Sequence, residues 1–370
     1  MHEPTAVDLF CGCGGMSLGA ARAGFRLVGA IDFDERALAS HKRNFPHSAH
    51  YGADLTGMSG SAVLEGLKIL TVDVLVGGPP CQGFSTMGKR DPADERNLLL
   101  TDFLRIVKEV GPSAFVLENV PALLHRRYRK LLDSALRPLK SAYDILDPHL
   151  LKATEVGVPT LRTRMFVVGF RKSVTTSVTD FWKMAEMPNP PVVREALDGL
   201  PADVTSNWTA SRGGVRKVRI SRQGAFFEAA SARIPTDLGD PAAVELLSRN
   251  LVTGCIGTLH SDELIRRYAG LQYGESDEKT KSVKLDPKGY CPTLRAGTGP
   301  DRGSFQAVRP IHYMRPRVIT PREAARLQGF PDWYQFDQTK WHSFRQIGNS
   351  VSPLVAEFVL RRVRKVLQRG

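Results

Sequence analysis

The stretch that decides the fold is Ala6-Val7-Asp8-Leu9-Phe10-Cys11-Gly12-Cys13-Gly14-Gly15, a short apolar run that passes directly into a glycine-rich turn. We expect a buried strand over residues 6–10 and, after the turn, a helix of small residues from Ser17 to Ala23. Glycine allows the backbone to approach a ligand closely, and in an open α/β sheet such a turn lies at the carboxyl edge, where ligands bind. The turn is neither a P-loop nor a G-x-G-x-x-G fingerprint, so it does not predict a phosphate cradle.

The alternation of apolar strands with helices continues through the first ~170 residues. We expect further strands over residues 27–31, 72–76, 114–117 and 165–170, and helices over residues 34–44 and 97–110. Continuous apolar strands that alternate with helices are typical of a parallel sheet covered on both faces. The sequence therefore predicts an α/β fold with a doubly wound, mostly parallel sheet.

The character of the sequence changes after Phe170. Residues 175–290 have weak apolar runs, and Gly, Ser, Thr and Pro are common in them. Order returns near residue 315, where a capping box, Thr320-Pro321-Arg322-Glu323, predicts a helix over residues 322–328. A last helix is expected over residues 353–368, with an apolar side that would pack back on the first domain. We therefore predict domains over residues 1–175 and 176–314, and a C-terminal segment over 315–370.

The composition bounds the class of protein. The chain has 370 residues, and 51 basic minus 38 acidic side chains give a net charge of +13, which favours a polyanionic partner such as nucleic acid. No apolar run reaches the length of a membrane span, and Met1-His2-Glu3-Pro4 lacks the features of a signal peptide, so we expect a cytoplasmic protein. The five cysteines are scattered, which excludes a disulfide framework. Cys11 and Cys13 lack a second pair at zinc spacing, so no metal site is expected.

Acidic and aromatic residues follow the second expected strand in Asp32-Phe33-Asp34. A carboxylate there can accept hydrogen bonds from both hydroxyls of a ribose, and the neighbouring ring can stack on a purine. Asp54, in Gly52-Ala53-Asp54-Leu55, could follow a third edge and meet the adenine amino group. An adenosine ligand without a pyrophosphate, such as S-adenosylmethionine, fits this pattern. The alternative is a glycine turn beside surface acids with no ligand.

A candidate nucleophile follows the third expected strand in Gly78-Pro79-Pro80-Cys81-Gln82. The prolines stiffen the backbone before the thiol, which would then stand at the ligand edge of the sheet. The fourth strand ends in Glu118-Asn119-Val120 at the same edge, and Arg162-Thr163-Arg164 precedes the last strand. The alternatives are a small buried cysteine, a solvated acid at a strand end and a solvated turn.

Together these segments form an ordered set. They are Asp8-Leu9-Phe10-x-Gly12-x-Gly14-Gly15, Gly78-Pro79-Pro80-Cys81-Gln82-Gly83-Phe84-Ser85, Glu118-Asn119-Val120, Arg162-x-Arg164, Arg322-Glu323-Ala324-Ala325-Arg326-Leu327-Gln328-Gly329-Phe330-Pro331 and Gln346-Ile347-Gly348-Asn349-Ser350-Val351. In this order, over nearly the whole chain, the set strongly resembles the DNA (cytosine-5) methyltransferases of bacterial restriction–modification systems. The resemblance implies the Rossmann-like fold of the S-adenosylmethionine-dependent methyltransferases, with a smaller, irregular target-recognition domain.

The resemblance also implies roles for individual residues. Cys81 would be the nucleophile, Glu118 would hold ring nitrogen N3, and Arg162 and Arg164 would orient the base and the loop. The residues expected at the cofactor are Asp8, Phe10, Gly12, Gly14, Asp32, Phe33, Asp54, Pro80, Leu98, Asn349 and Val351. Two positions depart from the family. Thr160 stands where glutamine is usual, and Asp32 stands where glutamate is usual.

The implied activity is methyl transfer from S-adenosylmethionine to C5 of a cytosine that is flipped out of double-stranded DNA. The protein would act without a metal, as a monomer at the nucleoid, beside a cognate restriction endonuclease that acts separately. Residues 83–97 would form a lid over the DNA. Residues 212–222 and 290–297 lie where the family keeps its target recognition.

Two alternatives stay open. One branch of the family methylates transfer RNA with the same core motifs, so a transfer RNA cytosine-5 methyltransferase is the first alternative. The long recognition region and Gly83 directly after Gln82 favour DNA. The second alternative is a catalytically silent DNA-binding protein, and the intact Cys81 and Glu118 argue against it.

Overall fold

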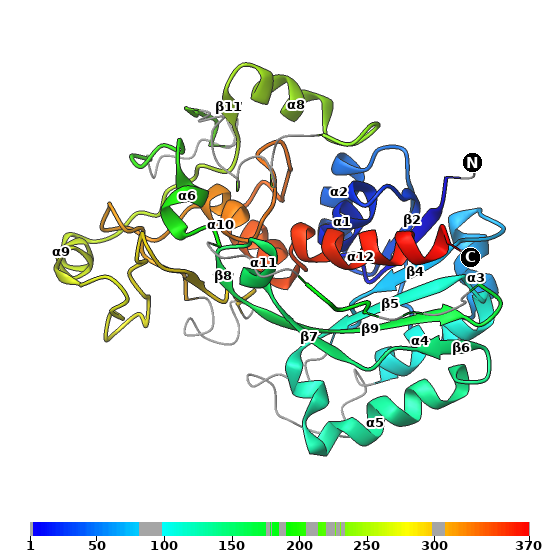
Figure 1. The fold of residues 1–370 in the computed structure, drawn as a ribbon. Coiled ribbons are helices and arrows are strands. Elements are labelled where there is room, and N and C mark those ends of the chain that lie inside the picture. Colours follow the sequence, from blue (N-terminus) through cyan, green and yellow to red (C-terminus); the bar gives the residue numbers. More distant parts are fainter. Residues whose placement is uncertain are drawn as a thin grey trace.

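The structure, a computed structural model, describes residues 3–80, 98–174, 178, 180–184, 190–204, 214–219, 226, 230, 234–297 and 308–369 (Figure 1). In this part of the chain the strands are β1 (Thr5–Leu9), β2 (Arg26–Asp32), β3 (Ala49–Gly52), β4 (Val74–Gly77), β5 (Ala114–Asn119), β6 (Tyr143–Ile145), β7 (His149–Lys152), β8 (Thr160–Leu161), β9 (Thr163–Arg171), β10 (Arg216–Lys217), β11 (Leu251–Val252) and β12 (Cys291–Pro292). The α-helices are α1 (Gly15–Arg22), α2 (Glu35–Asn44), α3 (Gly60–Leu67), α4 (Leu98–Val110), α5 (Arg126–Leu136), α6 (Val193–Leu197), α8 (Pro241–Ser248), α9 (Asp262–Gly270), α10 (Pro321–Leu327), α11 (Lys340–Asn349) and α12 (Pro353–Leu367). Short 3₁₀ turns are η2 (Pro121–Leu124), η3 (Arg137–Leu139) and η4 (Ala153–Val156).

The central sheet has the strand order β3-β2-β1-β4-β5-β9-β6, and β7 also pairs with β9. Strands β3 to β5 in this order are parallel to their neighbours. The chain builds outward from β1 to β3 and then crosses back to place β4 on the other side of β1. This reversal opens a crevice at the carboxyl ends of β1 and β4, the place where open α/β sheets bind ligands.

The far side of the sheet runs in the opposite direction. β9 is antiparallel to β5, and β6 and β7 are antiparallel to β9. A parallel strand would need a crossover of a dozen or more residues, usually a helix, whereas β7 reaches β9 through η4 and a short turn. The predicted mostly parallel α/β sheet is confirmed, with this antiparallel side as its exception.

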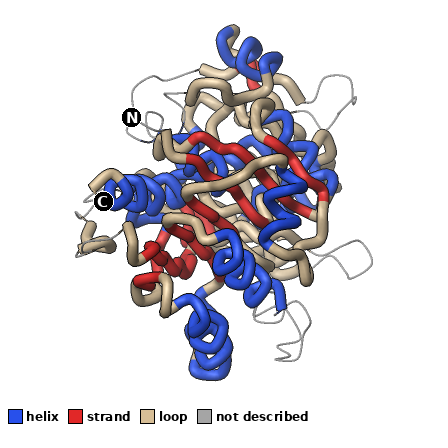
Figure 2. The backbone as a smooth tube through the Cα atoms, turned by 90° about the vertical axis from the view of Figure 1, so that its right-hand side faces the viewer, coloured by secondary structure: helices blue, strands red, loops and turns tan. Residues whose placement is uncertain are grey.

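Helices cover both faces of the sheet, as Figures 1 and 2 show. Val74 and Val76 of β4 belong to the core that α1 and α12 share, whereas Leu75 packs in the core of α3, α4 and α5. Apolar side chains that alternate between two buried faces explain why these strands read as continuous apolar runs. None of the helices in the described part of the chain has the length and apolarity that crossing a membrane requires.

The C-terminal helix returns to the start of the chain. α12 lies alongside α1, and both ends of the chain lie on the side away from α6, α9 and α10 (Figure 1). A Cβ atom on Gly19 of α1 would overlap the Cβ of Ala356 and lie 2.7 Å from the backbone nitrogen of Glu357. On the same helix pair, Arg22 donates to Glu357 at 2.6 Å. The first and last helices therefore meet at backbone distance.

The expected elements end within two residues of the observed ones. Sequence patterns did not predict β3, α3 and α5. β3 contains two apolar residues, Ala49 and Tyr51, among four, and α5 begins with an almost unbroken basic run. β3 is too short for a period to be recognised, and the helical spacing of the buried residues Tyr128, Leu132, Ala135 and Leu136 in α5 was overlooked behind this basic start.

Gly19→Ala tests the contact between α1 and α12. The added methyl group would push the two helices apart, so we expect a loss of about 1–3 kcal/mol in the free energy of unfolding, the usual cost of overpacking. Gly270→Ala at the end of α9 is the matched control, because a Cβ there meets nothing within 4 Å. Urea unfolding of both variants measures the difference. An unchanged or raised stability of Gly19→Ala would contradict the packing constraint.

Candidate active site and comparison with known proteins

Glu118 and Arg164 form a buried ion pair at the carboxyl edge of the sheet. Arg164 Nε lies 2.8 Å from Glu118 Oε1, and the two residues come from neighbouring strands, β5 and β9. Burial raises the pKa of Glu118, although the guanidinium groups of Arg164 and Arg162 act in the opposite direction. A carboxyl group in this state can hold or donate a proton at a ligand atom in the crevice.

The loop between β4 and the expected nucleophile packs against this pair. A Cβ on Gly78 would lie 2.9 Å from Glu118 Oε2, so a side chain there would displace the carboxylate from its present position. Asn119 Nδ2 donates to the backbone oxygen of Pro79 at 3.4 Å. Pro79 is buried and Pro80 is half-buried. These contacts fix the backbone that leads into Cys81, which itself lies outside the described residues, as does the expected lid over residues 83–97.

Arg162 joins three parts of the chain. Its Nη1 donates to the backbone oxygen of Leu294 at 3.3 Å, and its Nη2 donates to that of Ser350 at 3.0 Å. The side chain is buried, its Nε has no hydrogen-bond partner, and burial lowers its pKa well below the ordinary arginine value. Arg162 thus links the end of the catalytic sheet to the expected recognition and cofactor segments.

The glycine-rich turn is held by Asp32. Asp32 Oδ2 accepts a hydrogen bond from the backbone N–H of Gly12 at 2.7 Å, and Oδ1 accepts one from that of Asp34 at 2.8 Å. Gly12 has φ +55° and no atom within 4 Å of an added Cβ, so its outer side is open. Gly14 has φ +100°, and a Cβ there would lie 2.5 Å from atoms of Phe45 and Tyr334. Both glycines are required by backbone conformation, and Gly14 is also required by space.

Asp8 lies beneath this turn in a buried polar chain. Ser17 Oγ donates to Asp8 Oδ2 at 2.6 Å and lies 2.9 Å from His41 Nε2, and His41 Nδ1 lies 2.8 Å from His50 Nε2. Burial raises the pKa of Asp8 to about 7, and nearby Asp32 adds to the effect. Asp8 faces the interior rather than the crevice, so it supports the turn from behind.

Apolar side chains that stand in solvent mark the open side of the crevice. Phe33, directly after β2, is 67% exposed, and Leu98, at the start of α4, is 53% exposed. Phe10 is half-buried with φ +63°. An exposed ring directly beside a hydrogen-bonding residue, as Phe33 is beside Asp32, is typical of a ligand surface.

Of the remaining residues expected at the cofactor, Asn349 and Asp54 are exposed, whereas Val351 is buried. Asn349 is exposed, and Val351 is buried with its backbone oxygen against Gly15. Asp54, after β3, is exposed, and its Oδ1 accepts from the N–H and hydroxyl of Thr56 at 2.9 and 2.8 Å. Asp54 therefore lies at the same edge of the sheet as Asp32, with Oδ2 uninvolved in these bonds.

The segment from Arg322 to Pro331 is structural. Arg322 is buried and donates to the backbone oxygens of Thr253, Pro331 and Tyr334. Arg326 forms a buried pair with Asp332 at 2.6 Å. The predicted capping box is present, because Thr320 Oγ1 accepts from the N–H of Glu323 and the Glu323 carboxylate accepts from the N–H of Thr320.

The expected recognition segments are described in part. Residues 214–219 and 290–297 belong to the described chain, whereas Arg212 and Arg222 do not. β12 pairs with β8, one residue before Arg162, and the hydroxyl of Thr293 donates to the backbone oxygen of Leu161. Residues 291–294 therefore lie beside the arginine motif.

Two residues that the sequence reasoning missed hold this segment in place. Arg309 donates to the backbone oxygen of Arg295 at 2.9 Å, and its guanidinium lies 4.4 Å from the centre of the Phe344 ring. A Cβ on Gly348 would lie 2.5 Å from the backbone nitrogen of Ala296. Gly348 belongs to the motif Gln346-Ile347-Gly348-Asn349-Ser350-Val351, so the sequence pattern already pointed to it. Arg309 belongs to none of the motifs, so no sequence pattern pointed to it.

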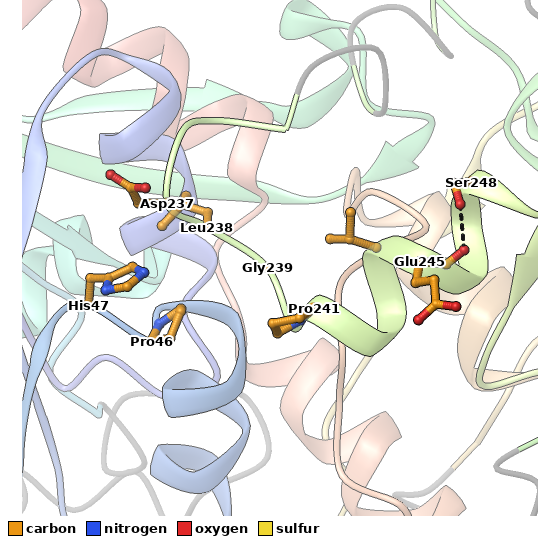
Figure 3. Close-up of a pocket in the computed structure, with 9 residues that line it drawn as sticks. Pro46, His47, Asp237, Leu238, Gly239, Pro241, Glu245 and Ser248 are labelled. Atoms are coloured by element: carbon orange, nitrogen blue, oxygen red, sulfur yellow. Dashed lines mark hydrogen bonds between the residues drawn. The ribbon is translucent and has the colours of Figure 1, made fainter.

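An open hollow of about 450 Å³ lies elsewhere on the molecule (Figure 3). Pro46 and His47, at the end of α2 away from Asp32, face Leu238, Gly239 and the start of α8 across it. None of the expected catalytic or cofactor residues lines this hollow. Within the described residues, no group of three histidine, cysteine or acidic side chains is placed to hold a metal ion.

Asp8→Asn tests the buried polar chain through the pH dependence of stability. The folded pKa of Asp8 is about 7, above the ordinary value of 3.8, so between these values folding takes up a proton. This contribution to stability is complete below about pH 4 and is lost as the pH rises through about 7. The variant should therefore lose less stability than the wild type between pH 4 and 8, by on the order of 1–4 kcal/mol.

Unfolding by urea at several pH values measures this difference. Glu35→Gln, which removes an exposed acid near the turn, is the control and should follow the wild-type profile. An Asp8→Asn profile parallel to that of the wild type would contradict the raised pKa.

Comparison with known proteins identifies the family. The sequence pattern of the C-5 cytosine-specific DNA methylases matches residues 5–365. The type II methyltransferase M.XorII of Xanthomonas oryzae pv. oryzae is 37% identical over 383 aligned positions, which cover 100% of this chain and 86% of the relative. M.DdeI of Desulfomicrobium norvegicum, also a type II methyltransferase, is 28% identical over 96% of this chain and 88% of its own.

Solved structures agree with this result. A protein described as a DNA modification methyltransferase encoded within an E. coli prophage is 44% identical, with a TM-score of 0.89 over 99% of both chains. The S. pombe Dnmt2 methyltransferase is 17% identical and shares the fold, with a TM-score of 0.64 over 99% of both chains. The chain thus belongs to the C-5 cytosine-specific DNA methylase family, as a DNA (cytosine-5-)-methyltransferase of the type II, restriction–modification kind.

Proposed function

We propose that this enzyme transfers a methyl group from S-adenosylmethionine to C5 of a cytosine flipped out of a specific duplex DNA sequence, through a covalent adduct between Cys81 and C6. The observation that carries the proposal is the buried Glu118–Arg164 pair beside the Gly78-Pro79 backbone. Cys81 follows two residues after Pro79 in the chain. A proton-holding acid, together with a thiol that follows this backbone closely in sequence, suits the activation of a pyrimidine ring.

The crevice at β1 and β2 fits an adenosine-bearing methyl donor. Asp32 carries a carboxylate whose oxygens each accept one backbone N–H and keep further acceptor capacity. Phe33 offers an exposed ring beside it, and the open backbone of Gly12 allows close approach. When bound, S-adenosylmethionine supplies an electrophilic methyl group on a sulfonium centre. Asp8 and Pro80 would support this pocket, and Asn349 and Val351 would close it from the C-terminal segment.

The chemistry explains why the thiol is needed. C5 of cytosine is a poor nucleophile, so direct methyl transfer would be slow. Addition of the Cys81 thiolate to C6 makes the ring enamine-like and raises the electron density at C5, the carbon that receives the methyl group. C5 then bonds to the methyl carbon, and the bond from that carbon to sulfur breaks with its electron pair left on sulfur. A base takes the C5 proton, the electron pair of the C5–H bond restores the C5–C6 double bond, and the bond between C6 and Cys81 breaks to release the thiolate.

Glu118 would act at ring nitrogen N3 during this addition. Negative charge develops at N3 when the thiolate attacks C6, and a protonated or hydrogen-bonded carboxyl group stabilises it. The raised pKa of Glu118 suits this task, because it keeps the proton available nearer neutral pH. Arg164 positions the carboxylate through its 2.8 Å contact, and Arg162 would fix the backbone around it.

The substrate carbon is stacked inside duplex DNA, so the base must leave the helix before it can reach Glu118. We propose that residues 176–314 recognise the target and that residues 83–97 close over it. The enzyme would act as a monomer at the nucleoid in the cytoplasm, beside a separate restriction endonuclease. The net charge of +13 supports a polyanionic substrate.

A methyl-transfer assay tests the proposal. Purified protein is given labelled S-adenosylmethionine with duplex DNA and transfer RNA in parallel, and the digested products are read by mass spectrometry. We expect 5-methylcytosine in DNA alone. Label in transfer RNA alone would support the RNA-directed alternative, and no label in either, with DNA binding retained, would support a silent binder.

Cys81→Ala tests the covalent mechanism. The variant keeps no nucleophile for C6, so methyl transfer should fall below detection while DNA binding remains. Cys255→Ala is the control, because Cys255 is a buried free thiol in another core cluster. Turnover by the Cys81 variant would contradict the adduct.

Asp32→Ala tests the cofactor assignment. The variant loses the carboxylate that holds Gly12 and is expected to bind the ribose, so the affinity for S-adenosylmethionine should fall about 10- to 100-fold. The rate at saturating cofactor should change less. Calorimetry measures the affinity, with Glu35→Ala as an exposed acidic control. An unchanged affinity of Asp32→Ala would refute the assignment.

A further inference from the structure

A basic surface at the start of α5 has no role in the proposed chemistry. His125, Arg126, Arg127 and Lys130 are all exposed. Arg129, between them, donates to Asp133 at 2.9 Å, whereas no carboxylate in the described part of the chain lies within 4.0 Å of Arg126, Arg127 or Lys130. We call these four exposed residues the α5 basic surface.

The positive charges of Arg126, Arg127 and Lys130 do not stabilise the helix that carries them. The first turn of α5 contains no acid, and the capping residue, His125, makes no side-chain hydrogen bond. Positive charge at a helix N-terminus is unfavourable, by about 0.3–1 kcal/mol for each group at low salt. α9 of the same chain shows the stabilising arrangement, since it begins with Ser261 as a bonded cap followed by Asp262 and Glu263. A local rule broken in this way often marks a functional surface.

The surface lies at the catalytic edge of the sheet. β5 ends one residue after Glu118, and the chain passes through η2, which packs on β9, directly into α5. Eight residues separate Glu118 from Arg126, so their Cα atoms are at most about 29 Å apart. The other end of α5 returns to the opposite edge, where Tyr143 pairs with Arg171. Only the basic end of α5 therefore faces the substrate side.

We propose that the α5 basic surface binds backbone phosphates of the DNA duplex that flanks the target cytosine. This inference rests on the proposed function and adds to it a second place where the protein contacts DNA, apart from the target cytosine. One helical turn of DNA spans about 34 Å, so the flank in reach is within about ten base pairs of the target. Tyr128, the aromatic residue in this run, is buried, with Arg127 5.6 Å above its ring. The surface thus offers charges to phosphates and no ring on which single-stranded bases would stack.

The test compares two triple variants with the same loss of charge. R126Q/R127Q/K130Q removes the two arginines and the lysine of the α5 basic surface, and K140Q/K172Q/K365Q removes three exposed lysines at the amino edge of the sheet. Fluorescence anisotropy measures the binding of a duplex of about 30 base pairs at salt concentrations between roughly 50 and 300 mM. Each lost phosphate contact makes the slope of log affinity against log salt concentration shallower by about 0.9. The slope of the α5 variant should therefore be shallower than that of the wild type by about 2–3. The salt slope of the control variant should stay within about 1 of the wild-type slope.

The outcomes separate this inference from the proposed function. Thermal unfolding and S-adenosylmethionine affinity should be unchanged in both variants, which shows that they fold. A salt slope of the α5 variant equal to that of the control would overturn the inference, and so would a loss of affinity for transfer RNA without one for duplex DNA. Methyl transfer to plasmid DNA by the wild type is measured in parallel, and its absence would instead count against the proposed function.

Discussion

The crevice at the carboxyl edge of the sheet depends on a contact between the two ends of the chain. Gly15 opens α1 against the backbone oxygen of Val351, where any side chain would overlap it. Cys13 Sγ lies 3.0 Å from Ser350 Oγ, and the hydroxyl of Tyr334 donates to the backbone oxygen of Cys13. The glycine-rich turn is therefore clamped from outside by residues more than 300 positions away. Asp32 and Asp8 hold the same turn from within the sheet.

The same C-terminal segment also touches the expected recognition region. Ser350 accepts hydrogen bonds from Arg162 and from Gln328, both at 3.0 Å, and Gly348 packs on the backbone of Ala296. One short segment, residues 346–351, thus contacts the glycine-rich turn, Arg162 and the backbone of residues 295–296. This arrangement explains why a motif so far along the chain from Cys81 belongs to the ordered set in the sequence.

Much of the fold and of the site followed from local patterns. The strand over residues 6–10, the glycine-rich turn after it and the position of Glu118 at the carboxyl end of a strand followed from the sequence, because a buried parallel strand imposes a continuous apolar run. The antiparallel direction of β9 did not, since it depends on the short path from β7. The roles of Ser17, Asn119 and Arg309 were also hidden, because each acts through individual contacts to particular backbone or side-chain atoms. Single polar contacts leave no period in a sequence.

The packing of α12 on α1 has a consequence for synthesis of the chain. At about 5–20 residues per second, the ribosome makes α12 tens of seconds after α1 has emerged. During that interval the small-residue face of α1 waits without its partner, and the nascent cofactor turn lacks its clamp. Because both ends of the chain lie on one side of the molecule (Figure 1), a circularly permuted chain with α12 ahead of β1 would turn this late, long-range event into an early, local one.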